Sequence, residues 1–308
     1  GLFRMTDVNV SVAAGAAGYR RGVILVIMAG VLWSTIGLGV RLMEVANVWQ
    51  ILFYRSMALA VFLFIIISIR SGGKPFPVIR KVGIAGAVGG VGLVFAFAGG
   101  IYAIQTTTVA NAMFLFASAP FITALLGRLI LGEFVRTATW VSMAVAMSGI
   151  VIMVYQGFSA GHMAGNIAAL LSAVGFATFT IAIRWQKLED MLPAVFLAGI
   201  FATITAGVIC LIYGYTFAIP NHDILIAIAM GIFQVGAGLT VYTIGSKHVP
   251  AAELALLALL EVVLGPIWVW ALLGETVGVY TLLGGGILLL ALVGNALSGV
   301  RRKPVPVM

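Results

Sequence analysis

Charged side chains are rare inside the long apolar stretches of this chain, and the few that occur there are its best candidates for chemistry. Glu261 lies near the middle of one stretch, and Arg55 lies about two turns inside another. An ionisable group at the centre of a membrane-spanning helix costs roughly 2.5–3.5 kcal/mol on insertion scales, so its presence there indicates a function or a specific partner. A buried carboxyl can bind a cation or carry a proton, whereas the planar guanidinium fork suits a carboxylate.

Each of these groups has two interpretations. Glu261 shares a helix face with Trp268, seven residues further on, so it either faces a cavity or stays protonated and hydrogen-bonded to a neighbouring helix. Arg55 either extends to the lipid headgroups or caps the outer end of a cavity, where it would attract a carboxylate. Gln234, the deepest of the amides, either lines a pathway or bridges two helices. Weaker candidates are Asn111, Gln105 and Glu253.

Aromatic residues form a second group of candidates. A cavity that they lined would suit an aromatic or apolar side chain, as in pockets that are mostly apolar with a few placed polar groups. Any one of them could equally face lipid or pack in the core. These candidates are Trp33, Tyr54, Phe97, Tyr102, Phe176, Phe179, Tyr242 and Trp268.

Two prolines within apolar stretches, Pro120 and Pro266, are expected to interrupt their helices, because proline lacks the backbone N–H of the helical ladder. The interruptions would act as hinges or expose backbone groups to a ligand, or they would serve packing alone.

Composition determines the elements that must position these residues. The chain has 308 residues, of which 62% are hydrophobic and 8% are charged, which excludes a water-soluble globule and predicts a polytopic, all-α membrane protein. About 20 apolar residues cross a hydrocarbon core of about 30 Å as a helix. Ten such segments are predicted, at residues 21–41, 47–69, 81–104, 109–131, 137–155, 164–184, 192–213, 222–245, 250–272 and 276–298.

The positive charges predict the orientation. If the N-terminus is cytoplasmic, only Arg41 and Arg55 of the 17 Lys and Arg residues lie on the outer side. Loops rich in Lys and Arg stay in the cytoplasm, so both termini are predicted to be cytoplasmic. The net charge of +8 is therefore a topology signal and does not indicate a nucleic-acid partner.

The two halves of the chain repeat one another. Leu131-Gly132-Glu133 recurs as Leu273-Gly274-Glu275, 142 residues later, and the segment that ends at Arg41 aligns with the one that ends at Arg184 at an offset of 143. Each half holds five spans, an odd number, so the second copy enters the membrane upside down. Inverted repeats are typical of transporters, with a site near the midplane where the copies meet. Glu261 aligns with Ala119, so the halves differ chemically there.

Other functional classes lack the residues that they need. His162, His222 and His248 all lie at predicted interfaces, and no metal-binding His-Glu-x-x-His motif or pair of intramembrane aspartates is present. No Gly-x-x-x-x-Gly-Lys motif is present to bind a nucleotide. We therefore expect neither an enzyme nor a cofactor nor a metal, and a structural or receptor-like membrane protein is disfavoured by the inverted repeat.

These motifs resemble a known family. The two five-helix halves, the two Leu-Gly-Glu motifs, Leu32-Trp33-Ser34 and Leu260-Glu261 before a proline-kinked helix are similar to the EamA-type, ten-helix branch of the drug/metabolite transporter superfamily. Within that branch, Tyr54-Arg55-Ser56 and the segment 265–270 resemble bacterial exporters of aromatic amino acids. The chain departs from the family at Val262, where proline is frequent, and at Phe176, where tryptophan is common.

The resemblance implies a basket of two inverted five-helix repeats around a central cavity. It implies a secondary transporter in the bacterial cytoplasmic membrane. This transporter would export amino acids, aromatic and other apolar ones, or related metabolites. An exporter of lipophilic cations or drugs that uses Glu261 is the alternative. The expected organisation is a mobile tail (1–20), repeat one (21–157), repeat two (158–298) and a basic tail (299–308), in a monomer or homodimer whose partners are a small substrate and the bilayer.

Overall fold

Helices form nearly all of the chain in the computed structural model, which describes residues 2–159, 161–249 and 251–300. The first repeat contains α1 (Leu2–Ser34), α2 (Ile36–Leu42), α3 (Val48–Arg70), α4 (Pro75–Arg80), α5 (Gly83–Thr106), α6 (Val109–Phe116), α7 (Ala119–Leu131) and α8 (Thr137–Ser159). The second contains α9 (Met163–Trp185), α10 (Leu192–Tyr213), α11 (Asn221–Ala229), the π-helix η1 (Met230–Ala237), α12 (Gly238–Gly245), the 3₁₀ turn η2 (Ser246–His248), α13 (Ala251–Leu273) and α14 (Val279–Val300).

Within the described residues, nine helical stretches are long and apolar enough to cross a membrane. They correspond to nine of the ten predicted spans, and α13 occupies the position of the remaining one, with its apolar part counted from Leu257 to Leu273. The all-α membrane architecture expected from composition is confirmed.

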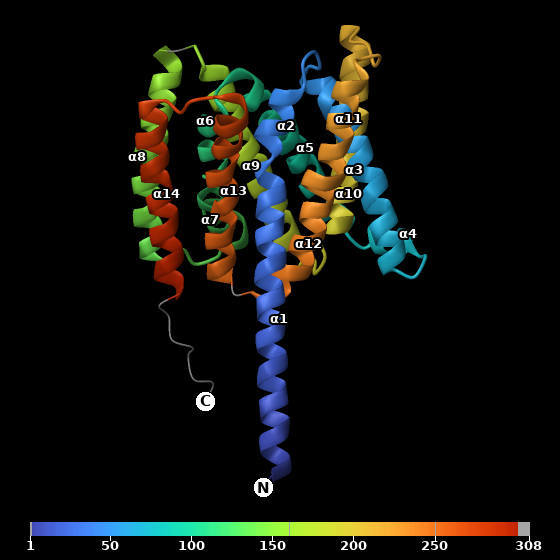
Figure 1. Cartoon of the computed structure of the whole chain (residues 1–308), viewed down its shortest axis with the longest axis vertical. Coiled ribbons are helices and arrows are strands. Elements are labelled where there is room, and N and C mark those ends of the chain that lie inside the picture. The colour runs from blue at the N-terminus through green and yellow to red at the C-terminus, as the bar shows by residue number, and fades with distance from the viewer. Residues whose placement is uncertain (1, 160, 250, 301–308) are drawn as a thin grey trace.

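The two repeats run in opposite directions. In Figure 1, α1 rises from the end of the bundle at which α14 finishes, whereas α9, the first helix of the second repeat, descends from the opposite end. The C-terminal ends of α7 and α13, which carry the two Leu-Gly-Glu motifs, therefore lie at opposite ends. Following the charge asymmetry, the end with Arg41 is here named the outer end and the end with Arg184 the inner end.

Several helices differ from their predicted form. The helix α1 begins at Leu2 and so includes residues assigned above to a tail, while 301–308 of the basic tail lie outside the described residues. The first span breaks at Thr35, and the fourth breaks at residues 117–118, directly before Pro120 in the first turn of α7. By contrast, α13 continues through Pro266, so the expected break in the ninth span is not found. The helix thus continues past the residue that lacks a backbone N–H, while it packs against α1, α6 and α14.

Glycines bring the helices of the two repeats into close contact. A Cβ on Gly92 of α5 would lie 2.7 Å from the carbonyl oxygen of Gly175 on α9, and one on Gly149 of α8 would lie 2.4 Å from the carbonyl oxygen of Gly284 on α14. Small residues permit such backbone contacts in lipid, where no hydrophobic effect drives helices together. Both contacts join one repeat to the other.

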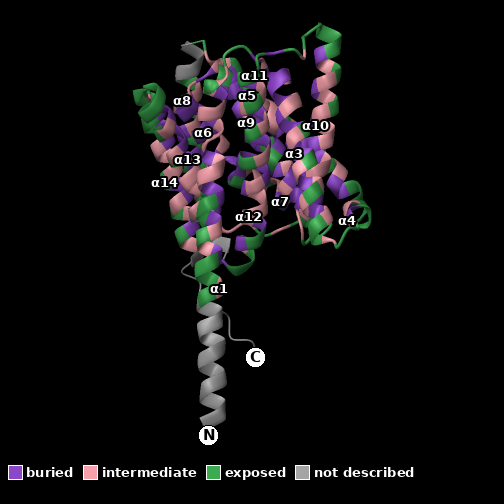
Figure 2. Cartoon of the chain, turned by 45° about the vertical axis from the view of Figure 1, so that its right-hand side comes forward, coloured by how far each residue is buried: buried purple, intermediate pink, exposed green. Residues whose placement is uncertain are grey.

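Buried residues gather where the helices face each other. Figure 2 shows them in purple along the inward faces, with exposed residues in green on outward faces and on α4. The stripe on α3 that faces α5, α10 and η1 includes Leu52, Leu59, Leu63 and the charged Arg55. A guanidinium is thus part of an otherwise apolar contact surface.

Candidate functional site

The two Leu-Gly-Glu motifs end α7 and α13 in the same way. Gly132 and Gly274 adopt the left-handed conformation, with φ of +66° and +71°. The next residue then donates its backbone N–H to the carbonyl six positions earlier, from Glu133 to Gly127 at 3.1 Å and from Glu275 to Val269 at 3.2 Å. Both helices thus end at a left-handed glycine, a residue that reverses the chain at little steric cost. The motif therefore sets where the glutamate that follows it is held.

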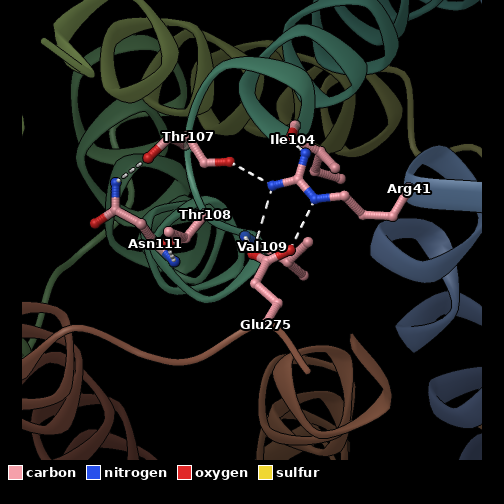
Figure 3. A network of polar contacts seen from close by, with 7 residues as sticks. All are labelled: Arg41, Ile104, Thr107, Thr108, Val109, Asn111 and Glu275. Atoms are coloured by element: carbon pink, nitrogen blue, oxygen red, sulfur yellow. Dashed lines mark hydrogen bonds and ion pairs between the residues drawn. The ribbon is translucent and has the colours of Figure 1, made fainter. Parts of the chain in front are cut away.

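Glu275 forms an ion pair with Arg41 at the outer end. The Arg41 Nε lies 2.8 Å from Oε2 of Glu275, and Arg41 Nη2 lies 3.4 Å from Oε1 (Figure 3). Arg41 also donates to the carbonyl oxygen of Ile104 and, at 2.7 Å, to that of Thr107. The backbone N–H of Val109 donates to Glu275 at 2.8 Å. The pair thus ties α2, the α5–α6 connection and the end of α13 together.

Glu133 forms the equivalent ion pair with Arg184 at the inner end. Arg184 Nη2 lies 2.6 Å from both carboxylate oxygens of Glu133. Since Arg41 aligns with Arg184 and Glu275 with Glu133, the two pairs are copies of one another. Each joins the first span of one repeat to the fourth span of the other.

Arg55 is enclosed within the bundle. Its side chain belongs to a residue only 3% exposed, and the guanidinium carbon lies 5.0 Å from the centre of the Phe97 ring on α5. Nη2 donates to the amide oxygen of Gln234 on η1 at 3.3 Å, and neither Nε nor Nη1 has a hydrogen-bond partner within the described part of the chain. The interpretation that Arg55 extends to headgroups is therefore wrong for this conformation. Through this bond Gln234 connects η1 to α3, and whether it also lines a pathway stays a prediction.

Glu261 is partly exposed on α13, and its carboxyl forms no hydrogen bond or ion pair with any described residue. Nothing in that part of the chain supports the interpretation of a carboxyl bonded to a neighbouring helix. Trp268, on the same face two turns later, donates its indole N–H to the Ser34 hydroxyl at 2.8 Å. This bond fastens α13 to α1 just before the break at Thr35.

Asn111 forms part of a polar contact between the repeats. Its amide nitrogen contacts the Thr107 hydroxyl at 3.2 Å and donates to the amide oxygen of Asn166 on α9. The amide nitrogen of Asn166 is buried without a partner among the described residues. Asn111 therefore connects the outer ion-pair region to the second repeat. Gln105 donates to the carbonyl oxygen of Ala46 at 3.0 Å, and the side chain of Glu253 lies outside the described residues.

The aromatic candidates do not gather at one place. Trp33 packs against Tyr242 with ring centres 5.1 Å apart, which joins α1 to α12. The Tyr54 hydroxyl donates to the carbonyl oxygen of Phe217 in the α10–α11 connection.

The remaining candidates differ in exposure. Phe97 contacts Arg55, and Phe179 is buried, whereas Phe176 and Tyr102 are 47% and 39% exposed.

A groove of about 520 Å³ lies between α5, α9 and Phe201 of α10. Its lining is almost wholly apolar, with Val88, Phe95 and Val174 among its residues, and it contains none of the charged or amide candidates. Arg55 and Gln234 are instead buried, at 3% and 6% exposed.

Sequence reasoning missed two features of the site. The charge count treated Arg41 only as a topology signal, although the repeat offset combined with inversion was enough to predict its pairing with Glu275. It also passed over Asp223, which is fully buried and accepts three backbone N–H groups, from Glu44, Val45 and Ala46, at 2.9–3.0 Å. Its position three residues after Pro220, in the first turn of a span, was the available signal.

The fold and these contacts define a class of protein. Within the described residues, nine membrane-length helices and α13 form two inverted copies, an arrangement found in many secondary transporters, and matched ion pairs link the copies at opposite ends. The chain belongs to the EamA-like transporter family, whose profile matches it twice, over residues 20–155 and 163–297.

Comparison with curated sequences and solved structures supports the fold and gives no information on the substrate. No curated protein sequence matches the chain. A solved structure described only as "Crystal structure of protein" is similar to it, with a TM-score of 0.62, 17% sequence identity, and coverage of 92% of this chain and 100% of that one. At this identity the likeness shows the arrangement of helices and nothing of the substrate.

Proposed function

We propose that this transporter exports amino acids, aromatic and other apolar ones, or related metabolites, by alternating access across the bacterial cytoplasmic membrane. Its termini would both be cytoplasmic. The finer likeness is to the aromatic-amino-acid exporter YddG, through Tyr54-Arg55-Ser56 and residues 265–270. Aromatic side chains on α5 and α9, with Phe97 beside a guanidinium, support a substrate that is apolar at one end and charged at the other.

The observation that carries the mechanism is the pair of crossed ion pairs. Arg41–Glu275 fastens the repeats together at the outer end, and Glu133–Arg184 fastens them at the inner end. A site between the repeats opens to one side only when the contacts at that side separate. Opening the two pairs in turn would give access from each side alternately, while the contacts that remain keep the halves together.

Counterflow in proteoliposomes tests the substrate class and does not depend on the direction of export. Vesicles loaded with unlabelled phenylalanine should accumulate labelled phenylalanine, and empty vesicles without protein supply the background. A quaternary ammonium dye is offered in parallel. Accumulation of the dye without that of phenylalanine would overturn the proposal.

The rival function is export of a lipophilic cation, and the carboxyl of Glu261 favours it because that group has no described partner on α13. The Glu261→Gln variant separates the roles. If the carboxyl carries a proton, the variant loses the dependence of transport on a pH gradient and keeps exchange at equal pH. If it binds a cation, exchange of the dye fails outright. If the group is structural, the variant melts at a lower temperature with unchanged pH dependence.

A further inference from the structure

A buried guanidinium without a counterion is the least satisfied group in the described bundle. Arg55 is 3% exposed, and two of its three nitrogens have no partner among the described residues. Its remaining contacts are a neutral amide oxygen, from Gln234, and the face of the Phe97 ring. A buried charge without a partner is unfavourable, so an enclosed cation of this kind favours any anion that can reach it.

Four carboxylates of the described chain are already engaged elsewhere. Glu275 pairs with Arg41, Glu133 with Arg184 and Asp190 with Arg70, while Asp223 accepts backbone N–H groups. Glu261 forms no ion pair within 4 Å of any described cation. The counterion of Arg55 is therefore not supplied by these residues.

The backbone around Arg55 is also unusual. Gln234 lies in the π-helical segment η1, and such segments occur frequently at functional sites because they widen the helix locally. Gly231, on the same segment, approaches α3 so closely that a Cβ there would lie 2.2 Å from the carbonyl oxygen of Arg55. The helix is thus held against α3 at the level of the guanidinium, with an amide that offers both a donor and an acceptor.

We infer that Arg55 is the binding site for the carboxylate of the transported molecule, an inference that rests on the proposed function and specifies its substrate class. A carboxylate would pair with one of the two bidentate edges of the guanidinium, Nε/Nη2 or Nη1/Nη2, on the side of Nη2 that the bond to Gln234 leaves open. Gln234 would donate its amide N–H to the same group, and Phe97 would pack against the apolar side chain. The ligand class is a monocarboxylic acid with an aromatic or apolar side chain.

Competition against phenylalanine counterflow by the wild-type protein tests the inference without any variant. Phenylpropionate, which keeps the carboxylate and lacks the ammonium, should compete, whereas phenylalaninamide, which lacks the carboxylate, should compete about 10- to 100-fold more weakly. Equal competition by the amide would overturn the inference.

Substitutions at Arg55 then test whether its guanidinium is the group that binds the carboxylate. Arg55→Gln should raise the half-saturating phenylalanine concentration about 10- to 100-fold, and Arg55→Lys, which keeps the charge without the fork, should fall between it and the wild type. Arg128→Gln removes an exposed cation of the same repeat and should behave as the wild type. Unchanged half-saturation in folded Arg55→Gln contradicts the inference, and if that variant does not fold, Arg55→Lys and the competition series decide.

A separate measurement distinguishes failure of this inference from failure of the proposed function. Phenylpropionate should raise the melting temperature of the purified wild type and of Arg128→Gln, and it should leave Arg55→Lys less protected. If the wild type moves no phenylalanine but is still protected in this pattern, the carboxylate site stands and the amino-acid function does not. If phenylalanine is transported and no carboxylate protects, the site is wrong and the function stands.

Discussion

The two ends of the molecule carry the same ion pair in different surroundings. At the outer end, Arg41 and Glu275 have side chains 26% and 21% exposed, and they also bond to the backbone at Ile104, Thr107 and Val109. At the inner end, the side chains of Arg184 and Glu133 are 45% and 35% exposed, and within the described chain the guanidinium forms hydrogen bonds with Glu133 alone. Sequence symmetry thus produced matched residues, whereas the packing around them gives the outer contact more bonds to break.

The largest difference is expected when each carboxylate is removed. Glu275→Ala leaves the Val109 N–H and part of the Arg41 guanidinium without acceptors, and a hydrogen bond to a charged group contributes about 1.5–3 kcal/mol. Glu133→Ala breaks an exposed pair that contributes about 1 kcal/mol or less. Melting of the two variants in one detergent should show the greater loss for Glu275→Ala. Equal losses would mean that the additional outer bonds add nothing.

Exchanging the charges should affect the two ends unequally. In Arg184→Glu/Glu133→Arg the ion pair re-forms, so the double variant should recover most of the stability lost by either single one. In Arg41→Glu/Glu275→Arg the new glutamate cannot donate to the carbonyl oxygens of Ile104 and Thr107, so recovery should be small. Coupling energies from the two double-mutant cycles measure this. Full rescue at the outer end would contradict the described contacts.

These same residues show which parts of the fold and of the site can be predicted from the sequence. The spans follow from composition, and the Leu-Gly-Glu repeat locates both glutamates, because helix termination by glycine is a local property of the chain. Whether Arg55 is buried or reaches the headgroups does not depend on the local sequence alone. A cation two turns inside a helix is equally compatible with headgroup contact and with burial, and only the packing of Phe97 and Gln234 from distant segments decides between them.

The breaks in the helices also differ in whether the local sequence predicts them. Pro120 coincides with a break in the fourth span, as proline chemistry predicts, but Pro266 lies within a continuous α13. The break at Thr35 and the π-helix around Gln234 contain no proline. They lie where α1 and η1 are packed against partners from other spans, so hydropathy and local motifs carry no signal for them.

The C-terminal ends of α7 and α13 should lose equal stability when their glycines are replaced by alanine. Gly132 and Gly274 have nearly the same positive φ, and a Cβ on either meets no atom within 4 Å. Alanine at each position should therefore cost roughly 1–2 kcal/mol from backbone conformation alone. Thermal melts of Gly132→Ala and Gly274→Ala should shift by similar amounts. A much larger effect at Gly274 would show that the asymmetry between the ends begins in the helix termini and not in the partners of the glutamates.

Raising the salt concentration is expected to produce the smallest difference between the two ends in the melting temperatures of their variants. The screening length falls from about 10 Å at 0.1 M to about 3 Å at 1 M ionic strength, which weakens exposed pairs more than buried ones. The melting difference between the wild type and Glu133→Gln should therefore shrink toward zero at high salt, because the inner pair is the more exposed. The difference between the wild type and Glu275→Gln should shrink less, since Arg41 and Glu275 are less exposed and also bond to the backbone. Melts of the three proteins at both salt concentrations give the comparison directly, with Arg128→Gln as a control for general salt effects on an exposed charge. If both differences shrank together, neither the lower exposure of the outer pair nor its backbone bonds would protect it from screening, and the proposed contrast between the two ends would be wrong.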